Sequence, residues 1–372
     1  MPVSRRIALV CLLLLLFPVR AGADGDFSVS ARAACLIDAR TGRILYAQNA
    51  DTRYPMASTT KIMTALLALE NAPLDDLVTA GEHASGVEGT SIYLSVGEAL
   101  SLRDMLYGLM LRSGNDAAVA IAEHIAGSVP AFAEMMNARA AELDADAIFA
   151  NPHGLPADDH EASALAMVRI ARAAMRNETF RAIVSTRRAT IPWIGNDYAR
   201  VLTNKNRLLT DYPGATGIKT GFTKSAGRCL VFSAAQEEME LIGCVLNCPD
   251  WFNEAARLLD HGFARYDAVP LLRAGETACT TDVLYARDPH LPLTVTEDLL
   301  LPLTAEETYQ LEYHARTASA PVAAGQVMGY VSVIVDGIPL LDVPLIAAAD
   351  VPEWGLLPAL KRIWQFWMGA WQ

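Results

Sequence analysis

Residues 54–67 read Tyr54-Pro55-Met56-Ala57-Ser58-Thr59-Thr60-Lys61-Ile62-Met63-Thr64-Ala65-Leu66-Leu67. After the turn-forming Pro55, apolar side chains recur at helical spacing, so the pattern predicts a helix that begins near Ser58. Ser58 and Lys61 would then share one face, within hydrogen-bonding reach of each other. The first turn of a helix has unpaired N–H groups and a positive dipole end, which stabilise negative charge. A serine nucleophile with a lysine base needs this arrangement, although serine at a helix start is also a common cap.

The composition is that of a globular protein. The chain has 372 residues, enough for two domains or for one large domain with appendages, and 52% of them are hydrophobic. Its net charge of −12 argues against binding to the backbone of nucleic acids, so we expect no nucleic-acid partner.

The first residues indicate export. Arg5 and Arg6 precede the apolar run 7–17, and the small residues Ala21-Gly22-Ala23 follow it. This order is typical of a secretory signal peptide, which we expect to span residues 1–23. The alternative, a membrane anchor, is disfavoured because the apolar run is short for a spanning helix.

The cysteines do not form a metal-binding pattern. Five remain after residue 23, an odd number for an exported protein, and most lie in apolar runs. We therefore expect small buried side chains, at least one of them unpaired unless it bonds another chain, and the pairing of the others stays open. The spacing of Cys244 and Cys248 does not indicate a metal site, and we expect neither a metal nor another cofactor. The five are Cys35, Cys229, Cys244, Cys248 and Cys279.

Residues 24–268 have strand-like segments at both ends and helical segments between them. This arrangement predicts an α+β domain whose terminal strands share one antiparallel sheet, with a helical cluster packed on it. The expected strands lie within residues 33–47, 214–222 (a turn that enters a strand), 229–234 and 239–246, and the expected helices cover 58–71, 102–111, 117–126, 130–143, 163–175 and 252–260.

Residues 269–350 differ from the preceding part in their sequence pattern. Short strand-like pieces are separated by Pro, Gly and Asp, and the Asp336-Gly337 dipeptide between two apolar runs predicts a hairpin. We expect a small all-β domain here, without catalytic residues.

Residues 351–372 form the last segment, which we expect to be an amphipathic helix. On a helical wheel, Lys361, Arg362, Gln365, Gly369 and Gln372 fall on one face. The opposite face carries Leu356, Leu360, Ile363, Trp364, Trp367 and Trp371. The tryptophans favour a helix that lies in a membrane interface, which would hold the exported protein on the outer face of the cytoplasmic membrane. The alternative is a helix that packs on the β domain.

Two further motifs join Ser58 and Lys61. Ser113-Gly114-Asn115 and Lys219-Thr220-Gly221 follow in the order and approximate separation of the three motifs of penicillin-recognising serine acyltransferases. Each motif alone has an ordinary structural explanation: a helix cap, a capping turn or a solvated strand end. The three in this order, after a signal peptide, favour an enzyme.

The surrounding sequence resembles the low-molecular-mass D-alanyl-D-alanine carboxypeptidases, a branch of the penicillin-binding proteins. The likeness covers nearly the whole mature chain and rests on residues 55–66, 111–118, 151–155 and 217–223. It implies a serine carboxypeptidase with the β-lactamase/transpeptidase-like fold, which removes the terminal D-alanine from peptidoglycan pentapeptides and is covalently inhibited by β-lactam antibiotics.

The resemblance also implies a role for each residue. Ser58 would be the nucleophile, a neutral Lys61 its base, and Ser113 a proton relay to the leaving amine. Asn115 would orient Lys61 and the substrate amide. Lys219 and Thr220 would hold the terminal carboxylate, and Gly221 would allow a close approach. The backbone N–H groups of Ser58 and Phe222 would form the oxyanion hole.

One position departs from the family pattern. Trp251 precedes Phe252-Asn253-Glu254, where some relatives carry an arginine, so an expected carboxylate contact is missing and Lys219 would bear more of this binding. Two alternatives also stand. A class A β-lactamase needs a glutamate that activates water, and Glu161 lies in the right region. A non-catalytic wall-binding or penicillin-sensing protein is the other.

Overall fold

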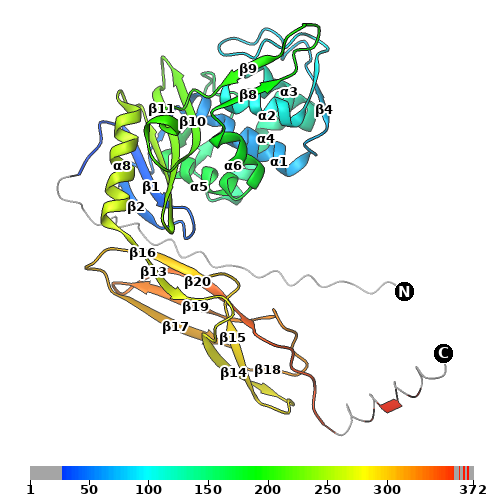
Figure 1. The fold of residues 1–372 in the computed structure, drawn as a ribbon, viewed down its shortest axis with the longest axis vertical. Coiled ribbons are helices and arrows are strands. Elements are labelled where there is room, and N and C mark those ends of the chain that lie inside the picture. Colours follow the sequence, from blue (N-terminus) through cyan, green and yellow to red (C-terminus); the bar gives the residue numbers. More distant parts are fainter. Residues whose placement is uncertain (1–26, 356–359, 361–362, 365–366, 368–372) are drawn as a thin grey trace.

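The computed structural model describes residues 27–355 together with residues 360, 363, 364 and 367. These residues form two parts, which we call the N-terminal lobe (residues 27–266) and the β lobe (residues 267–355), and Figure 1 shows the first above the second. The expected signal peptide lies outside the described residues, as does most of the expected tail helix.

A five-stranded antiparallel sheet forms the centre of the N-terminal lobe, with the strand order β10-β11-β12-β1-β2. Ala33 pairs with Leu246, so the two ends of this part of the chain are neighbours in one sheet, as the sequence predicts. β10 occupies one edge. The strands are β1 (Ala33–Asp38), β2 (Ile44–Gln48), β10 (Ala215–Thr223), β11 (Gly227–Gln236) and β12 (Met239–Leu246).

Helices cover both faces of this sheet (Figure 1). Alternate residues of β1 enter different cores, because Cys35 packs with the helical cluster and Leu36 packs under α8 (Trp251–Arg265). The α+β prediction is therefore confirmed. The helical cluster consists of α1 (Lys61–Asn71), α2 (Leu102–Leu111), α3 (Asn115–Ala126), α4 (Val129–Glu142), α5 (Ala164–Met175) and α6 (Glu178–Ser185).

The helix that follows Pro55 differs from the prediction at its start. A 3-10 turn, η1 (Ala57–Thr60), comes first, and α1 begins at Lys61. The Thr59 and Thr60 hydroxyls donate back to the carbonyls of Met56 and Ala57, at 2.7 and 2.8 Å. These local bonds compete with α-helical hydrogen bonding, so the chain turns more tightly here.

Small sheets of two or three short strands complete the N-terminal lobe. A buried ion pair joins two of these peripheral segments, because Arg200 on β9 binds both carboxylate oxygens of Glu98 at 2.6 and 2.8 Å. The remaining elements are β3 (Arg53–Tyr54), β4 (Leu77–Thr79), β5 (Ala99–Ser101), β6 (Ala147–Ile148), β7 (Glu161–Ser163), β8 (Arg188–Ile191), β9 (Arg200–Thr203) and the short helix α7 (Leu208–Asp211).

The β lobe consists of strands, as predicted, and its larger sheet has the order β17-β19-β20-β15-β14-β18. Asp336 and Gly337 both have positive φ and form the predicted turn between β19 and β20. The sequence analysis missed β13 (Asp267–Leu272) and β16 (Leu299–Leu303), which pair with each other. The other strands are β14 (Cys279–Leu284), β15 (His290–Thr294), β17 (Tyr309–Ala315), β18 (Ala318–Ser319), β19 (Val327–Val335) and β20 (Ile338–Ala347).

Two arginines just before β2 connect the lobes. Arg43 donates to the carbonyl of Pro302 and forms an ion pair with Glu307. Arg40 donates to the carbonyl of Asp298 at 3.1 Å. The turn between β1 and β2 therefore holds the β lobe beside the end of the sheet.

Of the expected helix of residues 351–372, the first five residues are not helical, and Val351 instead pairs with Val322 of the β lobe. Beyond them, Leu360, Ile363, Trp364 and Trp367 are described; all four are helical and exposed. Among the described residues, no helix combines the length and the apolar character that crossing a bilayer requires. The five cysteines after residue 23 carry free thiols, and all except the partly buried Cys279 are buried, as expected.

Candidate functional site

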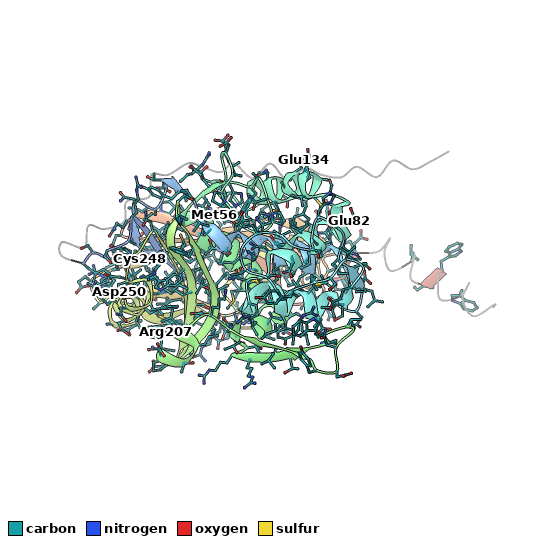
Figure 2. All side chains as sticks on the ribbon, turned by 90° about the horizontal axis from the view of Figure 1, so that it is seen from above. Met56, Glu82, Glu134, Arg207, Cys248 and Asp250 are labelled. Carbon is teal, nitrogen blue, oxygen red and sulfur yellow. The ribbon has the colours of Figure 1, made fainter. Side chains whose placement is uncertain are left out.

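Ser58 and Lys61 meet where η1 passes into α1. The Lys61 Nζ atom lies 3.1 Å from the Ser58 Oγ atom, because the tight turn places the two side chains on one side. Ser58 is partly exposed, whereas Lys61 is buried. Figure 2 labels Met56, two residues before Ser58, between the strands of the sheet and the helical cluster. The pair thus lies at the junction of the two layers, open to solvent on the serine side.

Lys61 has two further oxygen neighbours. Its Nζ donates to Asn115 Oδ1 at 2.7 Å and to the backbone carbonyl of His153. Burial lowers the pKa of Lys61 well below its ordinary value, and the charges of Lys219 and Lys205 lower it further. Both effects favour the neutral amine.

Ser113 lies in the turn between α2 and α3, and Asn115 is the first residue of α3. Asn115 is fixed on both sides, because its Nδ2 donates to the carbonyl of Glu88 at 2.6 Å while its Oδ1 accepts from Lys61. Ser113 adopts a positive φ of 64° and is buried. Within the described part of the chain, the Ser113 Oγ atom has no hydrogen-bond partner. Its hydroxyl is therefore buried without a hydrogen-bond partner among these residues.

The Lys219-Thr220-Gly221 motif runs along the edge strand β10. Lys219 is buried, and its Nζ donates to the carbonyl of Thr220 at 2.8 Å. Burial and the charge of Lys205 lower the pKa of Lys219 to about 7. A Cβ atom at Gly221 would lie 3.0 Å from the Ser58 backbone nitrogen. Glycine at this position lets β10 approach the Ser58 turn.

Phe222 follows on the same strand, and its side chain is 61% exposed. The β10 edge therefore carries the predicted binding residues in one line beside Ser58. The fold brings together all eight residues singled out from the sequence: Ser58, Lys61, Ser113, Asn115, Lys219, Thr220, Gly221 and Phe222.

This geometry agrees with the similarity of the chain to known proteins. Residues 19–250 match the family model described as "D-alanyl-D-alanine carboxypeptidase". The chain belongs to this family. Residues 266–353 match a second model, "Penicillin-binding protein 5, C-terminal domain".

Relatives of this carboxypeptidase family align over nearly the whole chain. The D-alanyl-D-alanine carboxypeptidase DacF of Bacillus subtilis is 33% identical over 98% of this chain and 97% of its own length. DacA of Escherichia coli is 30% identical over 99% of this chain and 98% of its own length. The crystal structure of penicillin binding protein 5 from Haemophilus influenzae superposes with a TM-score of 0.74, at 32% identity, over 88% of this chain and 99% of that one.

Sequence reasoning missed several groups that shape this carboxypeptidase site. The His153 carbonyl is a backbone atom, which no residue type reveals. Asp116 is buried and accepts from the backbone N–H groups of Ile92 and Leu94, so it holds the loop beside Ser113. The Asn115-Asp116 dipeptide was a possible signal, because a carboxylate inside a helical run needs partners.

Trp251 has a structural role in this family member. It begins α8 and packs, together with Phe252, against the core between that helix and the sheet. Arg207 lies over the Phe252 ring, 5.2 Å from its centroid. Trp251 is uncharged, so this position supplies no cation for a substrate carboxylate. Lys205 instead adds positive charge near Lys61 and Lys219.

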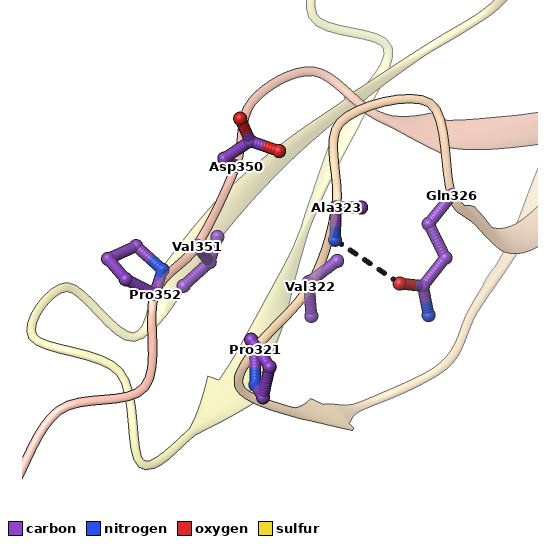
Figure 3. A pocket seen from close by; sticks show the side chains of 7 residues that line it. All are labelled: Pro321, Val322, Ala323, Gln326, Asp350, Val351 and Pro352. Carbon is purple, nitrogen blue, oxygen red and sulfur yellow. Dashed lines mark hydrogen bonds between the residues drawn. The ribbon is translucent and has the colours of Figure 1, made fainter. Parts of the chain in front are cut away.

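A pocket in the β lobe has fewer charged groups than the Ser58 site. Figure 3 shows it between the loop after β18 and the segment after β20. Asp350 is its one charged lining residue, and its Oδ1 already accepts from the backbone of Ala324 at 2.8 Å. The described residues contain no cluster of side chains that would hold a metal ion. The lining residues are Pro321, Val322, Ala323, Gln326, Asp350, Val351 and Pro352.

Proposed function

We propose that this family member is an exported serine carboxypeptidase that removes the terminal D-alanine from peptidoglycan stem peptides through an acyl-enzyme on Ser58. The observation that carries the proposal is the position of the Lys61 amine, 3.1 Å from the Ser58 hydroxyl and buried from water. A base must be within hydrogen-bonding reach of the proton it removes, and this one is.

The neighbours of Lys61 support its role as the base. A neutral primary amine has two N–H bonds and one lone pair. Asn115 Oδ1 and the His153 carbonyl accept the two N–H bonds, which leaves the lone pair for the Ser58 hydroxyl. Lys61 would take the hydroxyl proton as Ser58 Oγ attacks the carbonyl carbon of the penultimate D-alanine.

The free Ser113 hydroxyl supports the next step. When the tetrahedral intermediate collapses, the leaving D-alanine amine must gain a proton. Ser113 Oγ has no hydrogen-bond partner among the described residues, so it can donate to that amine and take the proton held on Lys61 in exchange. Asn115 would hold both the Lys61 amine and the substrate amide in place.

The β10 edge would bind the substrate. Its unpaired backbone groups suit an extended peptide, because an edge strand can pair with one more strand. Lys219 and Thr220 would hold the terminal carboxylate, with additional attraction from Lys205 in place of the arginine absent at position 251. The N–H groups of Ser58 and Phe222 would stabilise the oxyanion. A β-lactam would acylate Ser58 in the same way.

A β-lactamase is the less supported function. It needs a carboxylate beside Ser58 that activates water, and Glu161 was the candidate. Glu161 begins β7, where it pairs with Ile148 of β6. Its charge helps to raise the pKa of the surface residue Arg53, which forms a hydrogen bond with Asp146. Within residues 27–355, no carboxylate makes a hydrogen bond to Ser58 or Lys61.

The proposal extends to the location of the enzyme. Residues 1–23 would direct export, residues 24–268 would form the catalytic domain and residues 269–350 a β domain. Residues 356–372 would lie on the membrane surface, which the exposed apolar side chains of Leu360, Ile363, Trp364 and Trp367 favour. Deletion of residues 356–372 should move the protein from the membrane to the soluble fraction. Unchanged partition would assign the tail a packing role.

Two assays test the activity. The purified enzyme should release D-alanine from a peptide that ends in D-Ala-D-Ala, and a fluorescent penicillin should label it covalently. Ser58→Ala should abolish both signals, whereas the control Ser225→Ala, in the exposed turn after β10, should retain them. Rapid penicillin hydrolysis without D-alanine release would favour the lactamase, and labelling of the Ser58→Ala variant would exclude Ser58 as the nucleophile.

A further inference from the structure

His160 is a buried histidine that connects the two segments on either side of Lys61. It precedes β7 and is 4% exposed. Its Nδ1 atom lies 3.0 Å from the backbone nitrogen of Ala150, and its Nε2 atom lies 2.8 Å from the Thr60 hydroxyl. Ala150 introduces the loop that carries the His153 carbonyl, and Thr60 belongs to the turn that carries Ser58. The His160 ring thus links the loop that begins at Ala150 to the turn that carries Ser58.

The directions of these hydrogen bonds follow from their partners. A backbone N–H can only donate, so His160 Nδ1 accepts from Ala150 and carries no proton. A neutral ring then has its proton on Nε2, which donates to Thr60 Oγ1. The Thr60 hydroxyl in turn donates to the carbonyl of Ala57 at 2.8 Å. The relay runs in one direction, from Ala150 through His160 and Thr60 to Ala57.

The end of this relay bears on catalysis because a peptide unit is planar. The Ala57 carbonyl and the Ser58 N–H belong to one rigid plane and point in opposite directions. Fixing the carbonyl therefore fixes the direction of the N–H group. Ala57 also has a φ of 50°, a conformation that a residue with a side chain adopts only when its surroundings hold it.

A second contact confines the same peptide. Gly154 has a φ of 87°, and a Cβ atom there would lie 2.0 Å from the Ala57 carbonyl oxygen. The loop between Ala150 and Gly154 thus packs directly on the peptide that precedes the nucleophile. Since the same loop supplies the His153 carbonyl to Lys61, a shift of this loop would disturb the base and the oxyanion donor together.

We propose that His160 is a positioning residue, whose neutral imidazole holds the Ala57–Ser58 peptide so that the Ser58 N–H points into the oxyanion hole. This inference rests on the proposed function and deepens it. His160 does not touch the substrate; it acts through Thr60 and Ala57.

Protonation would reverse the bond to Ala150, because a charged imidazole has a donor at both nitrogens. Burial and the charge of Lys61 lower the pKa of His160 to about 4, which keeps the ring neutral near pH 7. The groups around the ring are the Phe149 ring, with its centroid 6.0 Å away, and the titratable side chains of Lys61 and His153.

The test compares acylation of purified variants by a fluorescent penicillin. His160→Ala removes the donor to Thr60, and we expect the second-order acylation rate constant to fall about 10- to 100-fold, since loss of a whole oxyanion donor costs about 100- to 1,000-fold. His160→Gln retains an acceptor and a donor, and should recover most of the loss. Thr60→Val should reproduce the effect of His160→Ala, and the double variant should lose little more.

A matched control separates positioning from stability. Phe149→Leu opens space beside the His160 ring without removing a bond of the relay, so it should lower Tm while the acylation rate stays within about threefold of wild type. If His160→Ala does not fold, the His160→Gln and Thr60→Val variants still decide the question.

The pH profile gives an independent readout. Both wild type and His160→Gln contain Lys61, so its titration cancels in the ratio of their acylation rates. As the pH falls from 6 to 4, this ratio should shift in favour of His160→Gln, which cannot be protonated. A folded His160→Ala enzyme at the wild-type rate, a Phe149→Leu loss equal to that of His160→Ala, or a constant ratio would overturn the proposal. Absence of wild-type acylation would instead contradict the function of Ser58.

Discussion

In the N-terminal lobe, Lys61 and Lys219 are 0% and 2% exposed, whereas the His290 and Asp282 side chains that pair in the β lobe are 72% and 65% exposed. Between residues 267 and 351, all described, the buried polar residues are two threonines, and no charged side chain is buried. Burial of a charge costs free energy unless partners compensate it. Charged side chains are therefore buried in the N-terminal lobe and not among residues 267–351. In the N-terminal lobe, the amines of Lys61 and Lys219 and the oriented backbone N–H groups take part in the proposed chemistry.

The largest effect is expected from replacing Lys61, the most deeply buried of these amines. Lys61→Met keeps the volume of the side chain but removes the base, so acylation of Ser58 should fall by on the order of 1,000-fold or more. Stopped-flow measurement with a fluorescent penicillin gives the rate. Lys224→Met, in the exposed turn after β10, is the control and should leave the rate unchanged. A Lys61→Met rate within tenfold of wild type would remove Lys61 from the mechanism.

The next effect concerns two hydrogen-bonded side-chain pairs, Arg200 with Glu98, which is buried in the N-terminal lobe, and His290 with Asp282, which is exposed in the β lobe. Glu98→Ala leaves the Arg200 guanidinium buried without its carboxylate, so unfolding free energy should fall by about 3–5 kcal/mol. Asp282→Ala in the β lobe should cost less than about 1 kcal/mol, because water already solvates that pair. Urea unfolding followed by tryptophan fluorescence measures both. Equal losses would show that burial does not distinguish the two pairs.

The buried amines should also make stability depend on pH. The folded pKa of Lys219 is about 7 and its ordinary value is 10.5, so between these values the unfolded chain binds more protons than the folded chain. The contribution of Lys219 to the free energy of unfolding therefore increases as the pH rises from about 7 to 10.5, and it decreases again as the pH falls towards 7. Calorimetry from pH 7 to 10 should show a smaller rise in Tm for Lys219→Met than for wild type, and parallel curves would contradict the shift.

The smallest effect is expected where the lobes meet. Arg43→Ala removes the bonds to Pro302 and Glu307, so we expect faster proteolysis of the connection near residue 266. D-alanine release from a soluble peptide should stay within about twofold of wild type, because the Ser58 site lies wholly in the N-terminal lobe. A larger loss of activity would show that the β lobe influences the site.

The three motifs were readable from the sequence because their chemistry resides in side chains at short, ordered spacings. Ser58, Lys61, Ser113 and Lys219 are of this kind. The antiparallel sheet also followed from local patterns, since β1 and β12 are buried on both faces and therefore read as long apolar runs.

Other parts of the site were not readable for physical reasons. The acceptor that His153 offers to Lys61 is a backbone atom, and the Ala57 peptide, with its positive φ, packs against Gly154 from a distant part of the sequence. His160 and Thr60 are 100 positions apart, and Arg200 and Glu98 are 102 apart, so one sequence does not reveal either pair. The strands β13 and β16 were missed because their proline-containing apolar segments lack clear alternation.

Cys279 has a practical consequence for measuring how this protein is oriented. Cys35, Cys229, Cys244 and Cys248 are buried in the N-terminal lobe, and burial raises the pKa of each thiol, which protects them from alkylation. Cys279 lies partly exposed on β14 at the other end of the molecule. Among the described cysteines, Cys279 in the β lobe is therefore the one that a thiol-reactive dye would reach, while a fluorescent penicillin would mark Ser58 under the proposed function. The native sequence thus offers two separate attachment points for energy-transfer measurements on a lipid surface.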